Sequence, residues 1–492
     1  MNVDFSGPGL PRVYAAGSHS EVERASELER ARSIRDQVVS ELEETIRHSP
    51  SPIRAMARMV IEVTRAMHEA GISQAVIEKQ VINRTIGDVD VRRIREREPG
   101  ASPGSLGDYS TIGEDLGLIL PGESLNGMLS EGRGYEEMRR RMTGVERRLL
   151  RDYQFDVRMY DVYGVGNPLL RSMLAESWQQ LYGLPLKTER TFVSIGALDG
   201  LDKTIRTLKL YFGRQYAEQP AICFPSPGFA VVLWQAQAND VEVINYATRE
   251  EQSFKLTGAE MSRLLQEHAN LRMLYLTVSN NPTAFDYEAD ELRAIFAAIA
   301  ADGREMAILA DTAYIGTGEP AADAERMRAF NTVIGGFDVL AHTIFVNSFS
   351  KICTLTGDRF GWVSTGNQQY ADAMQVTWNN TMAGMPAEWQ LRYTAMIDVL
   401  NERPWIQEKV RCLYRYRRAA LRRELAAINA QHHVFASIGL DDDATIYNWS
   451  KLVPGEDVIT LFRKTGLAAV DGSGFGYDKS YIRCSVGIHP AE

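Results

Sequence analysis

The sequence predicts an α/β protein built on a mainly parallel β-sheet with helices on both faces. Between about residues 185 and 370, short apolar runs alternate with helix-like stretches, which is typical of parallel sheets. The chain has 492 residues, enough for two or three domains, and 45% of them are hydrophobic, so a sizeable core is expected. A helical N-terminal extension and a smaller α+β domain complete the expected architecture.

Residues 1–110 are expected to form the helical extension. Apolar residues recur every three or four positions from Leu28 to Ile46, which predicts a helix with one apolar stripe. A second helix is expected to begin at Pro52, with Ser51 as its N-cap. Both helices can therefore pack against another part of the protein.

The large domain is expected over residues 176–370. Its predicted strands each end in small or polar residues and have the sequences TFVSIG, AICFPSP, MLYLTVS, MAILAD and TIFVNSF. Residues 371–492 begin with a helical stretch, Arg403 to Ala430, and end in short strand-like runs, so they predict the smaller domain. Ligands of open α/β sheets bind beyond the carboxyl ends of the strands, and the site is expected there.

Charge and cysteine content exclude several classes of protein. The 64 acidic residues outnumber the 54 basic ones, and a net charge of -10 argues against a nucleic-acid partner. No apolar run is long enough for a membrane helix, and the N-terminus lacks the pattern of a secretory signal. The four cysteines lie far apart and predict reduced thiols in a cytoplasmic protein, with no metal site.

A lysine follows one predicted strand directly. Lys351 comes after the run TIFVNSF, has Ser348 and Ser350 beside it, and precedes Arg359 by eight positions. A partly buried lysine has a lowered pKa and can form a Schiff base as a neutral amine. Hydroxyls and a guanidinium suit a phosphate dianion. This loop could therefore hold both an aldehyde carbon and a phosphate.

Other strand ends carry complementary groups. Asp311 ends an apolar strand, where a buried carboxylate needs a cationic partner such as a protonated pyridine nitrogen. Tyr314 and Asn281 could donate hydrogen bonds to a phenolate oxygen on the same pyridine ring. Gly196 lies between a strand and a helix whose first N–H groups suit a phosphate, and Phe229 could stack on a flat cofactor.

These segments, in this order, resemble the class I/II aminotransferase family of fold-type I pyridoxal-5'-phosphate (PLP) enzymes, from about residue 160 to residue 488. The resemblance implies that Lys351 is the Schiff-base lysine and general acid/base, with Asp311 and Tyr314 as further catalytic residues. It also implies a set of residues that bind PLP: Gly196, Ala197, Phe229, Asn281, Asp311, Tyr314, Ser348, Lys351 and Arg359.

The resemblance further implies substrate contacts and a partner subunit. Arg483, in the run SYIRCSVG, would bind the α-carboxylate of an amino acid substrate, together with Asn281. Residues 111–175 would form an interface and cover segment of a homodimer with shared active sites. Tyr163, or alternatively Tyr160, would reach the cofactor phosphate of the partner subunit.

The sequence departs from the family in two places. Ala284 replaces the glycine of the usual Asn-Pro-Thr-Gly turn, so a different turn is expected there. The N-terminal stretch is unusually long, and an unusual cover over the site keeps the reaction type open. The first expectation is an aminotransferase that converts an amino acid to a 2-oxo acid. The alternative is a lyase or synthase that uses the same carbanion for elimination, replacement, side-chain decarboxylation or S-adenosylmethionine chemistry. A third interpretation is a PLP-binding transcriptional regulator, against which the non-basic N-terminal stretch argues.

Overall fold

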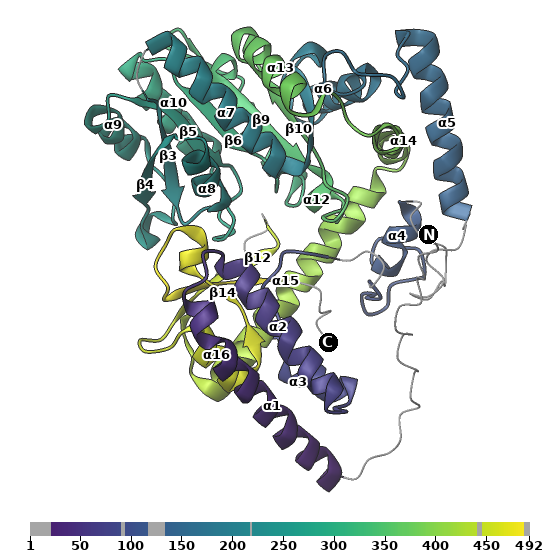
Figure 1. Cartoon of the computed structure of the whole chain (residues 1–492), viewed down its shortest axis with the longest axis vertical. Helices are drawn as coiled ribbons and strands as arrows, with labels where there is room; N and C mark the ends of the chain where they lie inside the picture. Colours follow the sequence, from purple (N-terminus) through teal and green to yellow (C-terminus); the bar gives the residue numbers. More distant parts are fainter. Residues whose placement is uncertain (1–20, 90–93, 117–132, 217–218, 440–444, 487–492) are drawn as a thin grey trace, which may run out of the picture.

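The computed structural model describes residues 21–89, 94–116, 133–216, 219–439 and 445–486, and its centre is a seven-stranded sheet (Figure 1). The strand order is β2-β10-β9-β6-β5-β3-β4. The bounds are β2 Thr191–Ile195, β3 Ala221–Ser226, β4 Glu242–Ala247, β5 Leu271–Thr277, β6 Ala307–Asp311, β9 Thr343–Ser348 and β10 Phe360–Thr365. All neighbours in this sheet are parallel except β10, which is antiparallel to both β2 and β9.

Helices cover both faces of this sheet, as the alternating pattern predicts. One face packs against α7 (Gly196–Tyr216), α8 (Val231–Ala238) and α13 (Gln368–Met382). The other packs against α6 (Pro168–Tyr182), α9 (Gly258–Glu267), α10 (Ala289–Asp302) and α11 (Pro320–Arg328). The strands are therefore buried on both sides, which explains their nearly continuous apolar sequences.

The smaller domain contains an antiparallel sheet in the order β11-β12-β15-β14. The bounds are β11 Phe435–Ser437, β12 Tyr447–Leu452, β14 Val470–Asp471, β15 Tyr481–Ser485 and α16 Val458–Thr465. The long helix α15 (Trp405–His432) runs from the sheet domain into this smaller domain (Figure 1). It follows α14 (Ala387–Glu402), which packs against α5 (Arg133–Tyr153).

The N-terminal helices pack on the smaller domain. They are α1 (Glu21–Arg47), α2 (Pro52–Glu69) and α3 (Gln74–Gln80), and α1 contacts α16. The Arg35 guanidinium, which is almost fully buried, donates to the Gln80 carbonyl at 3.3 Å and also to the Arg463 carbonyl. Strand β1 (Ile82–Asn83) then pairs in parallel with β13 (Leu467–Ala468). The extension is thus joined to the last part of the chain.

Most expected elements are confirmed, with three differences. The five predicted strands are present, but β4 and the antiparallel β10 were not expected from the sequence. Ser51 occupies the N-cap of α2, yet its side chain makes no capping hydrogen bond. The remaining short elements are α4 (Ile112–Asp115), α12 (Phe349–Ile352), β7 (Val333–Ile334) and β8 (Phe337–Asp338).

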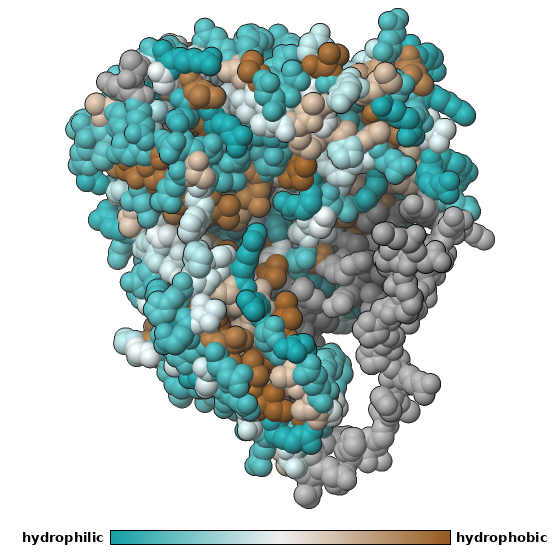
Figure 2. All heavy atoms as spheres, in the orientation of Figure 1, coloured by the Kyte–Doolittle hydropathy of each residue, from teal (hydrophilic) through white to brown (hydrophobic). Residues whose placement is uncertain are grey.

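On the face shown in Figure 2, hydrophilic side chains cover most of the described part, and hydrophobic ones are visible in patches between the elements. Among the described residues, no helix combines the length and hydrophobicity needed to cross a membrane. The same residues contain no group of three or more His, Cys, Asp or Glu side chains placed to hold a metal ion.

Candidate active site

A cavity of about 340 Å³ lies where the carboxyl ends of the sheet strands meet the smaller domain. The sequence prediction placed chemistry at these strand ends, and the structure brings most of those side chains to one cavity. The predicted residues that line it are Ala197, Phe229, Asn281, Asp311, Tyr314, Ser348, Lys351, Arg359 and Arg483. The strands that carry them are far apart in sequence, so their convergence follows from the sheet order.

Lys351 lies on the short helix α12, directly after β9. Its Nζ atom donates a hydrogen bond to the Gly87 carbonyl, from the segment that follows β1. Its own carbonyl accepts a hydrogen bond of 2.5 Å from the hydroxyl of Tyr414 on α15. The lysine backbone is therefore held from the smaller-domain side, while its amine points into the cavity.

Asp311 ends β6 and is 7% exposed. Its carboxylate accepts hydrogen bonds from the Tyr275 hydroxyl at 2.7 Å and from the Ala313 N–H at 3.0 Å. Burial raises the pKa of Asp311 despite these two donors. No described lysine, arginine or histidine forms an ion pair with it. This buried carboxylate therefore lacks a cationic partner that would offset the cost of burying its charge.

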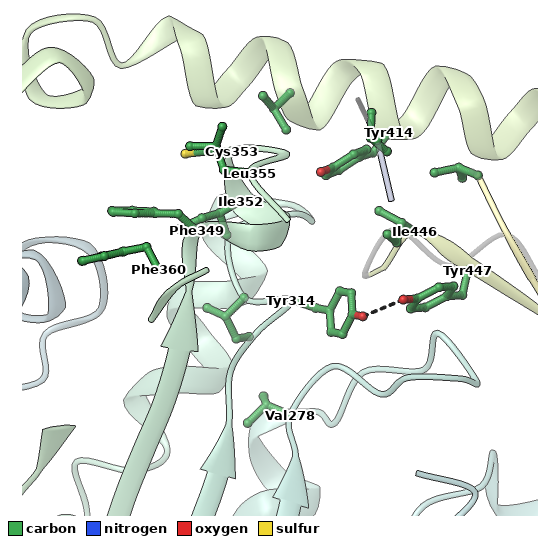
Figure 3. Packing of buried hydrophobic residues seen from close by; sticks show 14 of the residues in the cluster. Val278, Tyr314, Phe349, Ile352, Cys353, Leu355, Phe360, Tyr414, Ile446 and Tyr447 are labelled. Atoms are coloured by element: carbon green, nitrogen blue, oxygen red, sulfur yellow. Dashed lines mark hydrogen bonds between the residues drawn. The ribbon is translucent and has the colours of Figure 1, made fainter. Parts of the chain in front are cut away.

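Two tyrosine hydroxyls meet beside this carboxylate. The Tyr314 hydroxyl lies 2.9 Å from that of Tyr447 on β12, and Figure 3 shows the two side chains pointing at each other. Burial, and then Tyr447, raise the pKa of Tyr314 well above its usual value. Burial also raises the pKa of Tyr447, but the charges of Lys351 and Arg483 outweigh it and the net pKa is lowered. Tyr447 was missed by the sequence analysis.

Arg483 is 2% exposed, and its guanidinium is only partly satisfied. It donates to Asn281 Oδ1 at 3.1 Å and to the Thr85 carbonyl at 2.6 Å. It also lies over the rings of Tyr447, at 4.2 Å, and Phe475, at 4.8 Å. Its Nε has no partner among the described residues. A buried cation with an unused donor can bind an anion such as a carboxylate.

The start of α7 and the Lys351 loop form a narrow cradle. Gly196 has φ +73°, and a Cβ there would lie 2.6 Å from Arg359 Nη2. Arg359 itself has φ +58° and donates to the Thr356 carbonyl at 2.9 Å. The first N–H groups of a long helix, a guanidinium and the Ser348 hydroxyl thus face a common space that suits a phosphate.

The segment that covers this cavity was not expected from the sequence. Ile86, Gly87 and Asp88 line it, although they belong to the N-terminal extension. A Cβ on Gly87 would lie 2.1 Å from the Tyr447 hydroxyl oxygen, so only glycine fits at this position. The segment reaches the site through the pairing of β1 with β13, which joins positions nearly 400 residues apart and leaves no local sequence signal.

Tyr163 and Tyr160 do not line the cavity. They are 61% and 87% exposed, in the segment before α6, with Met159 and Val162 also exposed. Ala284 has φ +64°, a left-handed conformation that glycine adopts more readily than alanine.

A parallel-dominated sheet with a lysine, a carboxylate and a phosphate cradle at its strand ends defines the fold-type I class of enzymes. Residues 159–492 match the family described as aminotransferase class I and II, and the chain belongs to this family. Members of the family depend on PLP.

Individual relatives are more distant. The chain is 27% identical over 203 residues to an aspartate aminotransferase of Pyrococcus horikoshii, covering 41% of this chain and 47% of that protein. It is 29% identical over 194 residues to a histidinol-phosphate aminotransferase of Halorubrum lacusprofundi, covering 39% of this chain and 45% of that protein. The chain thus spans about half the length of the curated relatives it matches.

Solved structures extend the similarity of fold over most of the chain. The Thermus thermophilus aspartate aminotransferase with maleate superposes with a TM-score of 0.62 at 17% identity, covering 89% of this chain and 92% of that one. A Pyrococcus structure named protein-A1 superposes with a TM-score of 0.61 at 18% identity, covering 91% of this chain and 94% of that one. At this identity the likeness establishes the fold.

The residues present fit PLP. The buried Asp311 carboxylate lacks a cation among the described side chains, and a protonated pyridine nitrogen is one. A Cβ on Gly196 would lie 2.6 Å from Arg359 Nη2, so glycine lets the start of α7 and this guanidinium come close enough to bind one phosphate together. Lys351 lies in the same cavity and can react with the aldehyde carbon.

Proposed function

We propose that this protein is a PLP-dependent aminotransferase that transfers the amino group of an α-amino acid to a 2-oxo acid. One observation carries the proposal. Lys351, the buried carboxylate of Asp311 and the partly satisfied guanidinium of Arg483 share a cavity of about 340 Å³. PLP-dependent transamination requires three groups around one reacting carbon: a lysine, a carboxylate that pairs with a cation, and a guanidinium that binds an anion.

Each residue has a distinct proposed task toward the cofactor. Bound PLP supplies an electron sink for the carbanion formed at the substrate Cα. Asp311 accepts the N–H of the pyridine ring and keeps it protonated, because the buried carboxylate is stabilised by that charge. Tyr314 and Asn281 donate to the phenolate oxygen, and Phe229 stacks on the ring. Ser348, Arg359, Gly196 and Ala197 bind the phosphate.

Lys351 and Arg483 act on the substrate. Arg483 binds the α-carboxylate through its fork, and its bond to Asn281 orients the guanidinium beforehand. Lys351 removes the proton from the substrate Cα and returns one at C4' of the cofactor, since its amine lies in the same cavity. Because Arg483 is almost fully buried, its attraction for the carboxylate is stronger than it would be in water.

The proposed active form is a homodimer. The exposed cluster Met159, Tyr160, Val162 and Tyr163 is an apolar surface that a second subunit would cover. From there Tyr163, or Tyr160, would donate to the cofactor phosphate of the partner. The described cysteines are all free thiols, which supports a reducing, cytoplasmic location.

A second candidate is a lyase or synthase that uses the same carbanion. The segment of Ile86, Gly87 and Asp88 closes directly over Lys351, and such a cover favours reactions that need a dry carbanion. The cofactor after one turnover distinguishes the two functions. A stoichiometric 2-oxo acid with pyridoxamine phosphate, formed without an acceptor, supports transamination. Sustained turnover without an acceptor, with PLP regenerated each time, would show the second function.

A further inference from the structure

Asp88 places a negative charge in the active-site cavity. It lies on the covering segment, is half buried and lines the cavity. The Thr356 hydroxyl donates to its Oδ1 atom. Among the described residues, the other oxygen, Oδ2, has neither a hydrogen bond nor an ion pair. A half-buried carboxylate oxygen that receives no hydrogen bond is available to accept one from a donor group of a ligand.

The other charges that line the cavity already have proposed partners. Lys351 reacts with the cofactor aldehyde, Arg359 binds its phosphate, and Arg483 binds the substrate carboxylate. Asp311 pairs with the pyridine nitrogen. Within the described part of the chain, no lining cation is left for a second carboxylate on the substrate, whereas one anion is left for a positive charge. Within one subunit, the balance of charge therefore favours a cationic side chain.

The covering segment also sets the distance between the two ends of a substrate. At one end the Thr85 carbonyl accepts from Arg483, where the α-carboxylate binds. At the other end Asp88 contacts Thr356, beyond the point where Gly87 meets Lys351. Three residue steps span at most about 10 Å. A side chain as long as that of lysine or arginine can reach across such a distance.

We propose that Asp88 selects α-amino acids whose long side chain ends in an amine or a guanidinium, such as lysine, ornithine or arginine. This inference rests on the proposed function, because it assigns the substrate class of the same site. The terminal cation donates to Asp88 Oδ2 while Arg483 holds the α-carboxylate at the other end. Thr356 keeps the Asp88 carboxylate in place.

Matched pairs of substrates isolate the effect of the charge. Lysine and norleucine differ by the terminal amine, and arginine and citrulline differ by the charged nitrogen. We expect kcat/KM of the amino-donor half-reaction to be about 10- to 100-fold higher for the charged member of each pair, because a charge-assisted hydrogen bond contributes that much. In Asp88→Asn this ratio falls toward one. Asp290→Asn, which removes a carboxylate that is 93% exposed on α10, leaves the ratio unchanged.

A binding measurement removes the dependence on turnover. The reduced adducts N-phosphopyridoxyl-lysine and N-phosphopyridoxyl-norleucine carry the cofactor and the substrate in one stable molecule. Calorimetry on the cofactor-free protein should give about 10-fold tighter binding of the lysine adduct, and equal binding in Asp88→Asn.

Equal binding of the two adducts to the native protein overturns the assignment of Asp88. A kinetic preference for aspartate or glutamate overturns it as well. In either case transamination of other amino acids leaves the proposed function intact. Failure of every amino acid to convert the bound cofactor, with both adducts still bound, contradicts the proposed function instead. A charge preference between the adducts would then still support the role of Asp88.

Discussion

The hydroxyl groups of Tyr314 and Tyr447 lie 2.9 Å apart and join the sheet domain to the smaller domain at the candidate active-site cavity. Tyr314 follows the strand that carries Asp311, and Tyr447 begins the strand β12. Arg483 lies over the Tyr447 ring at 4.2 Å. Arg483, which we propose binds the substrate carboxylate, is thus in contact with Tyr447. Tyr447 in turn is hydrogen-bonded to Tyr314, which we propose donates to the phenolate oxygen of the cofactor.

Tyr447→Phe should reduce kcat by about 3- to 10-fold without loss of folding, since one hydrogen bond contributes about 0.5–1.5 kcal/mol. Tyr314 would lose the acceptor that orients its hydroxyl. Steady-state kinetics and a pH titration of the visible absorbance of the bound cofactor check this. An unchanged titration curve and an unchanged kcat would exclude a positioning role for Tyr447.

Gly87→Ala should abolish most activity, with a loss above about 100-fold, because the new methyl group would lie 2.1 Å from the Tyr447 hydroxyl oxygen. The covering segment must then move away from Lys351. The matched control is Gly213→Ala in α7, where a Cβ would meet nothing within 4 Å. Full activity in Gly87→Ala would contradict the position of this segment over the site.

Lys351→Ala should remove the covalently bound cofactor and all turnover. Borohydride reduction followed by peptide mapping should place the phosphopyridoxyl group on Lys351 in the native protein. Lys203 is the informative alternative, but its amine is buried, pairs with Asp199 at 2.9 Å and lies over the Trp378 ring. Labelling of Lys203 instead would refute the assignment.

Asp311→Asn should have opposite effects on stability and on catalysis. Turnover should fall by at least about 100-fold, because the ring nitrogen loses the charge that keeps it protonated. In the cofactor-free protein the variant should be more stable than the native protein. The folded-state pKa of Asp311 is raised by burial, so the native protein loses stability as the pH rises above the ordinary carboxyl pKa of about 3.9.

The stability difference between Asp311→Asn and the native apoprotein should therefore grow with pH above about 4 and vanish in stronger acid. Urea denaturation at several pH values measures it. A native apoprotein that gains stability relative to the variant across this window would contradict the raised pKa.

Mixed dimers test the proposed shared sites. Lys351→Ala and Tyr163→Ala, each impaired alone, should regain activity when their subunits are exchanged, up to about a quarter of the native value, because one site per hybrid is intact. The control is Leu210→Ala, at a side chain that is 48% exposed elsewhere. This variant should have native-like activity alone. Its mixture with Lys351→Ala should therefore show no activity beyond what Leu210→Ala itself contributes. A fully active monomer at working concentration would refute the shared site.

The sequence predicted the parts of the site that local chemistry marks. Lys351, Asp311 and Asn281 each follow an apolar strand, so their places at the sheet edge could be foreseen. β10 escaped prediction because FGWVST follows the Lys351 loop and its antiparallel direction depends on pairing with β2 and β9. Tyr447, Gly87 and Asp88 escaped because only long-range packing brings the smaller domain and the extension to the cavity.

The pairing of β1 with β13 has a consequence for the order of folding. Ile82 leaves the ribosome 385 residues before its partner Leu467. The covering segment therefore has no strand to pair with until the whole sheet domain, which lies between the two strands in sequence, has emerged. Such a long-range contact costs much loop-closure entropy and forms late. The growing chain can complete its sheet domain first, and the covering segment is fixed over the cavity only after β13 has emerged.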